Sequence, residues 1–231
     1  MTEQHVSTLF SYGQNTVFCP FFILEELTMK YSTDRRTQKT RTALSAALIS
    51  LMNEKSYDSI SVQEILDRAD IGRSTFYTHY RDKNELLIDG LQGLREFLQN
   101  AQKTAASTST HSYEKVIGFS LAMFEHAHDH KDVFFSLVDG QGWSTVLRNL
   151  EEIIVQLMKE EARPLYNNTS ASAIPFDLLI DFLGAIFTSV ITWWFHNKKL
   201  INPKEINILF RALVIPTLTD NLKTYSFLEK G

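Results

Sequence analysis

The chain has 231 residues, of which 44% are hydrophobic, and its formal net charge is −4. This length can bury the core of one or two soluble domains, and nine glycines and five prolines are too few for a β-rich or disordered chain. The single cysteine, Cys19, excludes an internal disulfide framework and is typical of a reducing, cytoplasmic compartment.

The first 33 residues are predicted to be an N-terminal tail. Residues 1–28 contain neither a positively charged n-region nor a small-residue cleavage site, which argues against a signal peptide. Glu25-Glu26 requires purine-rich codons, and these lie two codons before Met29. Because this arrangement resembles a ribosome-binding site followed by a start codon, one hypothesis is that Met29 is the initiator and that residues 1–28 are upstream sequence. The alternative is an ordinary variable tail.

Residues 34–90 are predicted to form a small head of three helices. The first helix, about 35–54, carries an apolar stripe at helical spacing, which consists of Leu44, Ala47, Leu48 and Leu51. A second, short helix begins at the capping-box sequence Ser61-Val62-Gln63-Glu64. Gly72 is expected to allow the break that follows, by adopting a positive φ or by capping the next helix.

The third helix, about 73–80, is predicted to bury Phe76 and Tyr80, which lie four residues apart on one face. Asp82 and Glu85 form a second capping-box pattern at the start of a long fourth helix. This fourth helix joins the head to the rest of the chain.

Residues 91–231 are predicted to form a larger helical body. A polar linker, 104–112, precedes five helices at about 113–130, 132–138, 143–163, 175–197 and 203–226. Pro216 is expected to kink or end the last helix. The uncharged stretch 182–195 is shorter than a membrane-spanning helix needs to be and is interpreted as a buried helix. The fold class is therefore all-α, with no membrane partner.

Two short helices joined by a tight turn, and supported by a longer helix, describe a helix-turn-helix. In such a unit the second helix presents polar side chains to DNA, and Arg73 can form a fork onto a guanine edge. Lys83 lies in the first turn of the next helix, where backbone amides favour an anion. A basic run precedes the unit and comprises Arg35, Arg36, Lys39 and Arg41. The alternative is three ordinary packed helices.

Residues 36–88 resemble the DNA-binding domain of the TetR family of transcriptional regulators. The resemblance lies in Phe76-Tyr77, His79-Tyr80, Lys83 and Leu86-Leu87, which match the family's pattern in and after its recognition helix. It implies phosphate contacts from Thr75, Tyr77, His79 and Lys83. It also implies base contacts from Arg73, Ser74 and Thr78, with Gln63 as a further candidate. Gly72 departs from the pattern, because it removes a hydroxyl that could cap the helix and contact a phosphate.

The same resemblance implies a homodimer formed through the last two long helices, 175–197 and 203–226, and an effector site in the body. The stretch WWFHNKKLINPKEI, 193–206, is similar to a C-terminal type that includes regulators of dihydroxyacetone kinase operons. Aromatic residues are the candidates for a ligand pocket, with plain core packing as the alternative for each: Phe119, Phe124, Trp143, Phe182, Phe187, Trp193 and Trp194.

His126 and His130 are spaced to lie on one helix face, as two metal ligands would be. The alternative, which we favour, is that histidines near a helix C-terminus interact with its dipole and face water. No metal or cofactor is therefore expected. The spacing of Ser and His residues indicates no catalytic triad, so the chain is not expected to be an enzyme.

The sequence thus predicts a DNA-binding transcriptional regulator that binds a palindromic operator as a homodimer, with repression as the default and with a small molecule or a partner protein acting on its body. Two alternatives remain. One is an activator or co-regulator whose body binds a protein, and the other is a helical interaction protein that does not bind DNA.

Overall fold

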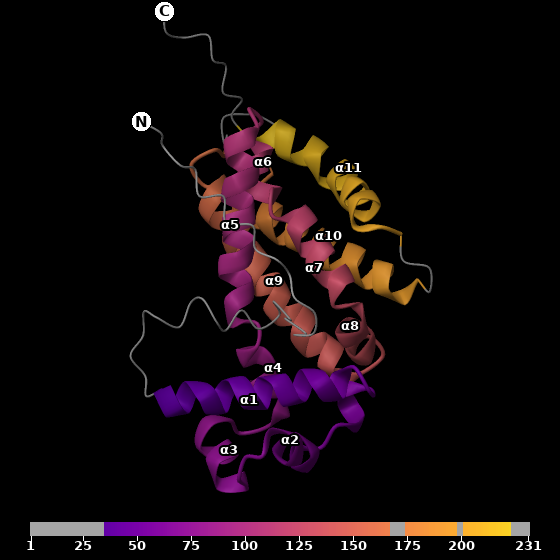
Figure 1. Ribbon diagram of the computed structural model, residues 1–231. Coiled ribbons are helices and arrows are strands. Elements are labelled where there is room, and N and C mark those ends of the chain that lie inside the picture. The colour runs from indigo at the N-terminus through magenta and orange to yellow at the C-terminus, as the bar shows by residue number, and fades with distance from the viewer. Residues whose placement is uncertain (1–34, 167–173, 198–200, 223–231) are drawn as a thin grey trace, which may run out of the picture.

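A computed structural model describes residues 35–166, 174–197 and 201–222, and within these ranges the chain is built from helices (Figure 1). The head, residues 35–90, contains α1 (Arg35–Met52), the 3-10 helix η2 (Tyr57–Ser59), α2 (Val62–Ala69), α3 (Arg73–His79) and α4 (Lys83–Asp89). The body, residues 91–222, contains α5 (Gln92–Thr108), α6 (Tyr113–Ile117), α7 (Ser120–Asp129), α8 (Lys131–Leu137), α9 (Gln141–Ala162), α10 (Phe176–His196) and α11 (Pro203–Asn221). The all-α prediction is confirmed.

Three sequence predictions fall outside the described residues. They are the N-terminal tail with the hypothesis of a start at Met29, residues 198–200 within the stretch 193–206, and residues 223–226 of the last predicted helix.

The head has the core that its sequence predicts. The apolar stripe of α1 is buried, and it packs against α2 and α4. At the start of α2 the Ser61 hydroxyl accepts from the Glu64 amide, and the Glu64 carboxylate accepts from the Ser61 amide at 3.0 Å. This capping box satisfies two amides that an eight-residue helix would otherwise leave exposed, so the predicted helix start is confirmed.

In the turn between α2 and α3, Gly72 caps the next helix, which is the second of the two predicted possibilities. The left-handed residue is Asp70, with φ of 54°, whereas Gly72 has φ of −68° and serves as the N-cap of α3. Asp tolerates the left-handed region better than most residues, which explains why this position does not require glycine.

The second capping box is only half formed. Asp82 accepts from the Glu85 amide at 2.9 Å, but the Glu85 carboxylate accepts from the amide and the guanidinium of Arg81 instead. The predicted long fourth helix is also interrupted, because Gly90 and Leu91 form a turn between α4 and α5. There the Leu91 amide donates to the carbonyl of Ile88, three residues earlier, which gives a tighter turn than the α-helix. The turn includes Gly90, and glycine has a low helix propensity.

Two boundaries in the body were also predicted wrongly. Helix α5 continues to Thr108, so most of the expected linker is helical. The Thr104 and Thr108 hydroxyls donate to carbonyls of the preceding turn, which lets these polar residues remain in a helix. The helix expected over 113–130 breaks at Gly118, where a Cβ would lie 2.7 Å from the Cβ of Ala105. The close approach of α5 and α6 therefore requires glycine at this position.

In the last two helices, the structure excludes one of the two outcomes expected at Pro216 and corrects the interpretation of residues 182–195. Helix α11 runs past Pro216 to Asn221, so the helix does not end at the proline. Helix α10 is the one helix in the described ranges that is long and apolar enough to cross a membrane, but half of its most apolar window is buried in the protein. Its other face is exposed, so the stretch 182–195 is a half-buried helix and not a fully buried one.

The head lies at one end of the molecule, with α1 between the body and the pair α2 and α3 (Figure 1). Helix α9 contacts α4 and η2 of the head, and it also packs along α10 in the body. This arrangement leaves α3 at the far end of the molecule, away from the body helices.

Candidate nucleic-acid interface

Helix α3 separates its packing side chains from its outward ones. Phe76 and Tyr80 are 0% and 3% exposed, and their ring centroids lie 5.7 Å apart in the core of the head. Tyr77, between them in sequence, is 52% exposed. The predicted division of α3 into a buried face and an outward face is therefore present in the structure.

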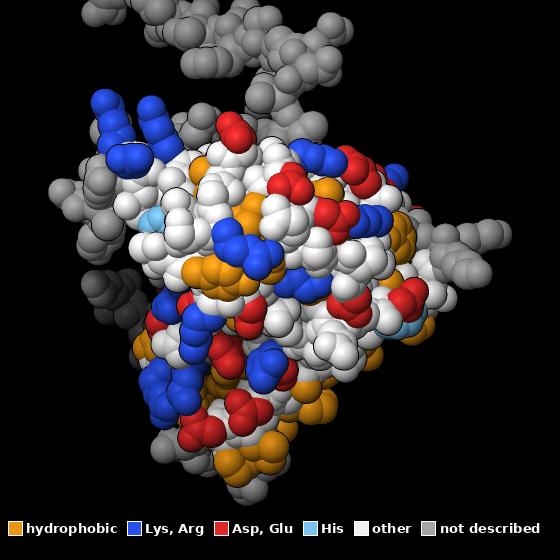
Figure 2. Space-filling view, turned by 90° about the horizontal axis from the view of Figure 1, so that it is seen from below, with side chains coloured by type: hydrophobic (Ala, Val, Ile, Leu, Met, Phe, Trp, Pro, Cys, Tyr) orange, Lys and Arg blue, Asp and Glu red, His pale blue; other side chains and the backbone are white. Residues whose placement is uncertain are grey.

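The candidate DNA-contacting residues lie on α3, on the neighbouring α2 and, for Lys83, at the start of α4. Their exposure falls into two groups: the side chains of Gln63, Arg73, Ser74, Tyr77 and Thr78 are exposed, and those of Thr75, His79 and Lys83 are half-buried. The end of the molecule that carries them also presents Lys and Arg side chains, with Asp and Glu between them (Figure 2). In the basic run at the start of α1, three members are exposed, namely Arg35, Arg36 and Lys39.

Polar contacts link the base-reading candidates of the two helices. The Arg73 guanidinium donates to Gln63 Oε1 at 3.2 Å, and the Gln63 amide group donates to Asp67 at 2.7 Å. Within α3 the Thr78 hydroxyl donates to the Ser74 carbonyl at 2.9 Å. Arg73 and Gln63 are therefore adjacent on one surface, and both can be oriented before any ligand arrives.

Lys83 has a role that the sequence did not reveal. Its ammonium donates to the carbonyls of Tyr57, Asp58 and Ile60 at 2.9, 3.1 and 2.7 Å, and it lies 4.5 Å from the centroid of the Tyr57 ring. Burial lowers the pKa of Lys83, while the nearby carboxylates of Asp58 and Glu64 oppose that change. Because an ammonium has three donors, this arrangement uses all of them within the head and competes with the expected phosphate contact.

A second polar cluster, also missed from the sequence, holds the end of α3. Arg41 of α1 forms an ion pair with Asp89 of α4, and the Tyr80 hydroxyl donates to Asp89 at 2.6 Å. The hydrogen bond with Asp89 raises the pKa of Arg41 above its ordinary value, and burial is the first cause of the raised pKa of Tyr80. Arg41 therefore turns inward, unlike the other members of the basic run. The signal in the sequence for this cluster was Asp89, an aspartate at the end of an otherwise apolar face of α4.

The aromatic candidates for a ligand pocket fill the core of the body instead. Five of them are at most 6% exposed, namely Phe119, Phe124, Trp143, Phe187 and Trp194. Phe124 stacks on Phe187 at 5.2 Å between ring centroids and meets Trp194 edge-on at 5.7 Å. Trp193 and Phe182 are 52% and 48% exposed, on the outer face of α10. The predicted aromatic pocket is thus replaced by ring-to-ring packing.

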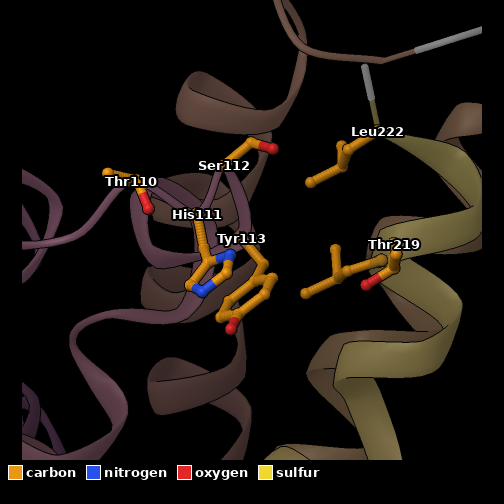
Figure 3. A pocket seen from close by; sticks show the side chains of 7 residues that line it. Thr110, His111, Ser112, Tyr113, Thr219 and Leu222 are labelled. Atoms are coloured by element: carbon orange, nitrogen blue, oxygen red, sulfur yellow. The ribbon is translucent and has the colours of Figure 1, made fainter. Parts of the chain in front are cut away.

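A small hollow lies elsewhere in the body, between the loop before α6 and the end of α11 (Figure 3). Its volume is about 90 Å³, and it is lined by Thr110, His111, Ser112, Tyr113, Leu218, Thr219 and Leu222. The rings of His111 and Tyr113 stack at 5.0 Å and face the α11 side chains across the hollow (Figure 3). None of the predicted pocket aromatics lines this hollow.

His126 and His130 do come together, with ring centroids 4.9 Å apart. Within the described ranges, no group of three or more His, Cys, Asp or Glu side chains is arranged to hold a metal ion. Our expectation that these histidines face water is wrong for His126, which is 3% exposed and packs against the Phe97 ring. Burial, and then the charge of His130, lowers the pKa of His126 to about 3.

The fold and the outward polar face of α3 define a helix-turn-helix regulator. Residues 44–89 match the family described as bacterial regulatory proteins of the tetR family, and residues 114–215 match the family described as the transcriptional regulator C-terminal region. The chain belongs to the TetR family of transcriptional regulators. Members of this family are regulators and not enzymes, and they are typically soluble proteins of the cytoplasm.

Three proteins illustrate what the chain is similar to. A stretch of 60 residues, 26% of this chain, is 44% identical to the helix-turn-helix transcriptional regulator YxbF of Bacillus subtilis, but it spans only 16% of that protein's length. The structure of a TetR transcriptional regulator from Streptococcus agalactiae is 26% identical, with a TM-score of 0.55 over 78% of this chain and 96% of that one. The dihydroxyacetone kinase operon activator DhaS shares the fold, with a TM-score of 0.51, 14% identity, and coverage of 80% of this chain and 98% of that one.

Proposed function

We propose that this protein binds a palindromic DNA operator as a homodimer and acts as a cytoplasmic transcriptional repressor. The observation that carries the proposal is the division of α3, which buries Phe76 and Tyr80 and directs Arg73, Ser74, Tyr77 and Thr78 outward at the far end of the molecule. Such a helix can enter the major groove while its inner face keeps it fixed to the head.

The proposed contacts fall into two kinds. Arg73, Ser74, Thr78 and Gln63 read base edges, and Arg73 is suited to guanine because its guanidinium can donate to both O6 and N7. Thr75, Tyr77 and His79 contact phosphates, which fix the register of the protein on the duplex. For Lys83 we propose a phosphate contact only if its ammonium gives up one of its three carbonyl partners.

The exposed apolar side chains support association through the last two helices. Of the nine large hydrophobic side chains that are exposed in the described ranges, six lie on α10 and α11: Leu178, Phe182, Trp193, Ile208, Leu209 and Leu213. An apolar surface of this kind is typical of a protein interface. A two-fold dimer formed there would present two copies of α3, and therefore two half-sites related by symmetry.

The test is binding of the purified protein to the DNA that flanks its own gene, across a salt series and against a random duplex. Arg73→Ala is expected to lower operator affinity by about 5- to 150-fold and to relax preference at one base position. Arg148→Ala, an exposed arginine on α9, is the matched control and is expected to leave affinity unchanged. If wild-type protein showed no preference for its own flanking DNA, or if both arginine variants bound like wild type, the helical interaction protein would be the better explanation.

An activator or co-regulator whose body binds a partner protein is the second candidate. It is favoured by the packing of the predicted pocket aromatics against one another, which leaves the core of the body filled at these rings. DhaS, which shares the fold, is an activator. A reporter gene placed under the identified operator distinguishes repression from activation. Deletion of the regulator raises reporter expression for a repressor and lowers it for an activator.

A further inference from the structure

We propose that η2 and the first turn of α9 form a fixed joint between head and body, and that Asp58 is a positioning residue whose contact across this joint sets the direction of α3. The structural part of the proposal stands on the contacts at the joint. Its consequence for operator choice rests on the proposed function.

Asp58 supplies the cap that α9 lacks. The residue at the N-cap position of α9 is Gly140, which has no side chain to accept from the first amides of a 22-residue helix. The Gln141 amide donates instead to Asp58 Oδ2 at 2.8 Å, and the Gly142 amide lies 3.4 Å from Asp58 Oδ1. A carboxylate of the head therefore caps the longest helix of the body.

The two glycines at the start of α9 are needed for the close approach of η2. A Cβ on Gly140 would lie 2.8 Å from the carboxylate carbon of Asp58, and a Cβ on Gly142 would lie 2.5 Å from Cδ1 of Tyr57. Neither glycine has a positive φ, so their role is to leave space and not to allow an unusual backbone conformation. The sequence Asp139-Gly140-Gln141-Gly142 carries this signal, although it reads as a simple loop.

On the head side, η2 is held to the helix that follows α3. The Lys83 ammonium, at the first residue of α4, donates to three carbonyls of residues 57–60. The Tyr57 hydroxyl donates to Asn84 Oδ1 at 2.7 Å, and the Tyr57 ring is 1% exposed. The direction of η2 is therefore transmitted to α4, and through the short turn at residues 80–82 to the end of α3.

On the body side, α9 connects the joint to the exposed face of α10. The two helices approach closely at Gly184, where a Cβ would lie 2.5 Å from Val155 Cγ2. In a dimer formed through α10 and α11, the separation of the two α3 helices would depend on the angle at each joint. A change at Asp58 should then alter which spacing of half-sites is tolerated, without altering the side chains that read bases.

The first experiment measures amide hydrogen exchange in the full-length protein without DNA. Asp58→Ala is expected to accelerate exchange at the first amides of α9 about fivefold, the factor that corresponds to loss of one helix cap, and to leave α3 unchanged. Gly140→Ala, which pushes the carboxylate away, is expected to do the same. Glu54→Ala is the matched control, because that carboxylate bonds only to Arg68 within the head. Unchanged exchange in α9 for both joint variants would overturn the joint.

The second experiment measures affinity for the operator and for a version lengthened by one base pair between its half-sites. For Asp58→Ala we expect the affinity for the operator, divided by the affinity for the lengthened version, to fall at least about fivefold relative to wild type and to Glu54→Ala. A ratio equal to that of the control would overturn the positioning role even if exchange had changed. A wild-type protein that binds no DNA would refute the proposed function and the positioning role with it, whereas the exchange result would still decide the joint.

Discussion

The head and the body of this protein are held together in different ways. In the head, helices of seven or eight residues follow α1, and each is fixed by named polar contacts: the Ser61–Glu64 box, the Asp82 cap, the Lys83 ammonium and the Arg41–Asp89–Tyr80 cluster. In the body, the longer helices pack aromatic rings against one another around Phe124.

This difference has a physical origin. Helices shorter than about 12 residues are marginal on their own, so directional contacts at their ends are needed to fix where they start and how they lie. Longer helices bury more apolar surface, so packing supplies more of their stability even where an end is capped, as at Asn202 of α11. A helix that presents side chains to a ligand needs a fixed orientation, whereas a packed helical body needs mainly stability.

The largest expected effect lies in the body core. Phe124→Ala removes a ring that is 0% exposed and contacts three other aromatic rings, and we expect it to lower the free energy of unfolding by about 3 to 5 kcal/mol. Phe135→Ala, which removes a ring that is 40% exposed, should cost much less. Urea unfolding of both variants checks this, and equal losses would mean that the body does not depend on its aromatic core.

A buried histidine should make the body sensitive to acid. The pKa of His126 in the folded protein is about 3, below its ordinary value of 6.5, so the unfolded chain takes up the proton first as pH falls. The stability is therefore complete above pH 6.5 and should decrease below it by about 1.4 kcal/mol per pH unit.

His126→Leu is expected to remove most of this slope between about pH 6.5 and pH 4.5, measured by urea unfolding. His196→Leu, an exposed histidine at the end of α10, is the control and should leave the slope as it is. An unchanged slope in the His126 variant would assign the acid sensitivity to other groups.

In the head, Asp89→Asn tests the polar cluster at the end of α3. The change leaves the Arg41 guanidinium with a weaker partner, and we expect a loss of about 1 to 3 kcal/mol in the free energy of unfolding. Glu54→Gln breaks an exposed ion pair with Arg68 and should cost less. If the two variants were equally stable, the Arg41–Asp89–Tyr80 cluster would not be what fixes α3.

The smallest effect is expected at the start of α2. Ser61→Ala removes one half of the capping box and should cost about 1 kcal/mol, measured as a lower urea midpoint with an unchanged denaturant slope. Ser59→Ala is a neighbouring control, because that hydroxyl donates to a carbonyl and does not cap α2. A larger loss in the control would show that the turn, and not the cap, positions the helix.

The sequence predicted the elements of the head better than those of the body, and the reasons are local. The stripe of α1, the Ser61 cap and the pair Phe76 and Tyr80 are patterns within a few residues, so they can be read without the fold. The break at Gly118 depends on what packs beside it, because a Cβ at this position would collide with Ala105 of another helix.

The candidate site was predicted in the same uneven way. The outward side chains of α3 follow from helical spacing, whereas the partners of Arg41 and Lys83 lie 23 to 48 residues away in the sequence. The sequence left a pocket and plain core packing open for the aromatic candidates, because ring spacing along a helix is the same for a pocket wall and for a packed core. Only the fold distinguishes the two.

The three tryptophans report on different parts of the molecule. Trp143 and Trp194 are 6% and 0% exposed, whereas Trp193 is 52% exposed on the outer face of α10. Neighbouring residues of one helix thus hold one indole in a dry environment and one in water. A water-soluble quencher should reach the fluorescence of Trp193 first, and any partner that covers α10 should shield it. The protein therefore carries its own optical probe of association, which requires no label.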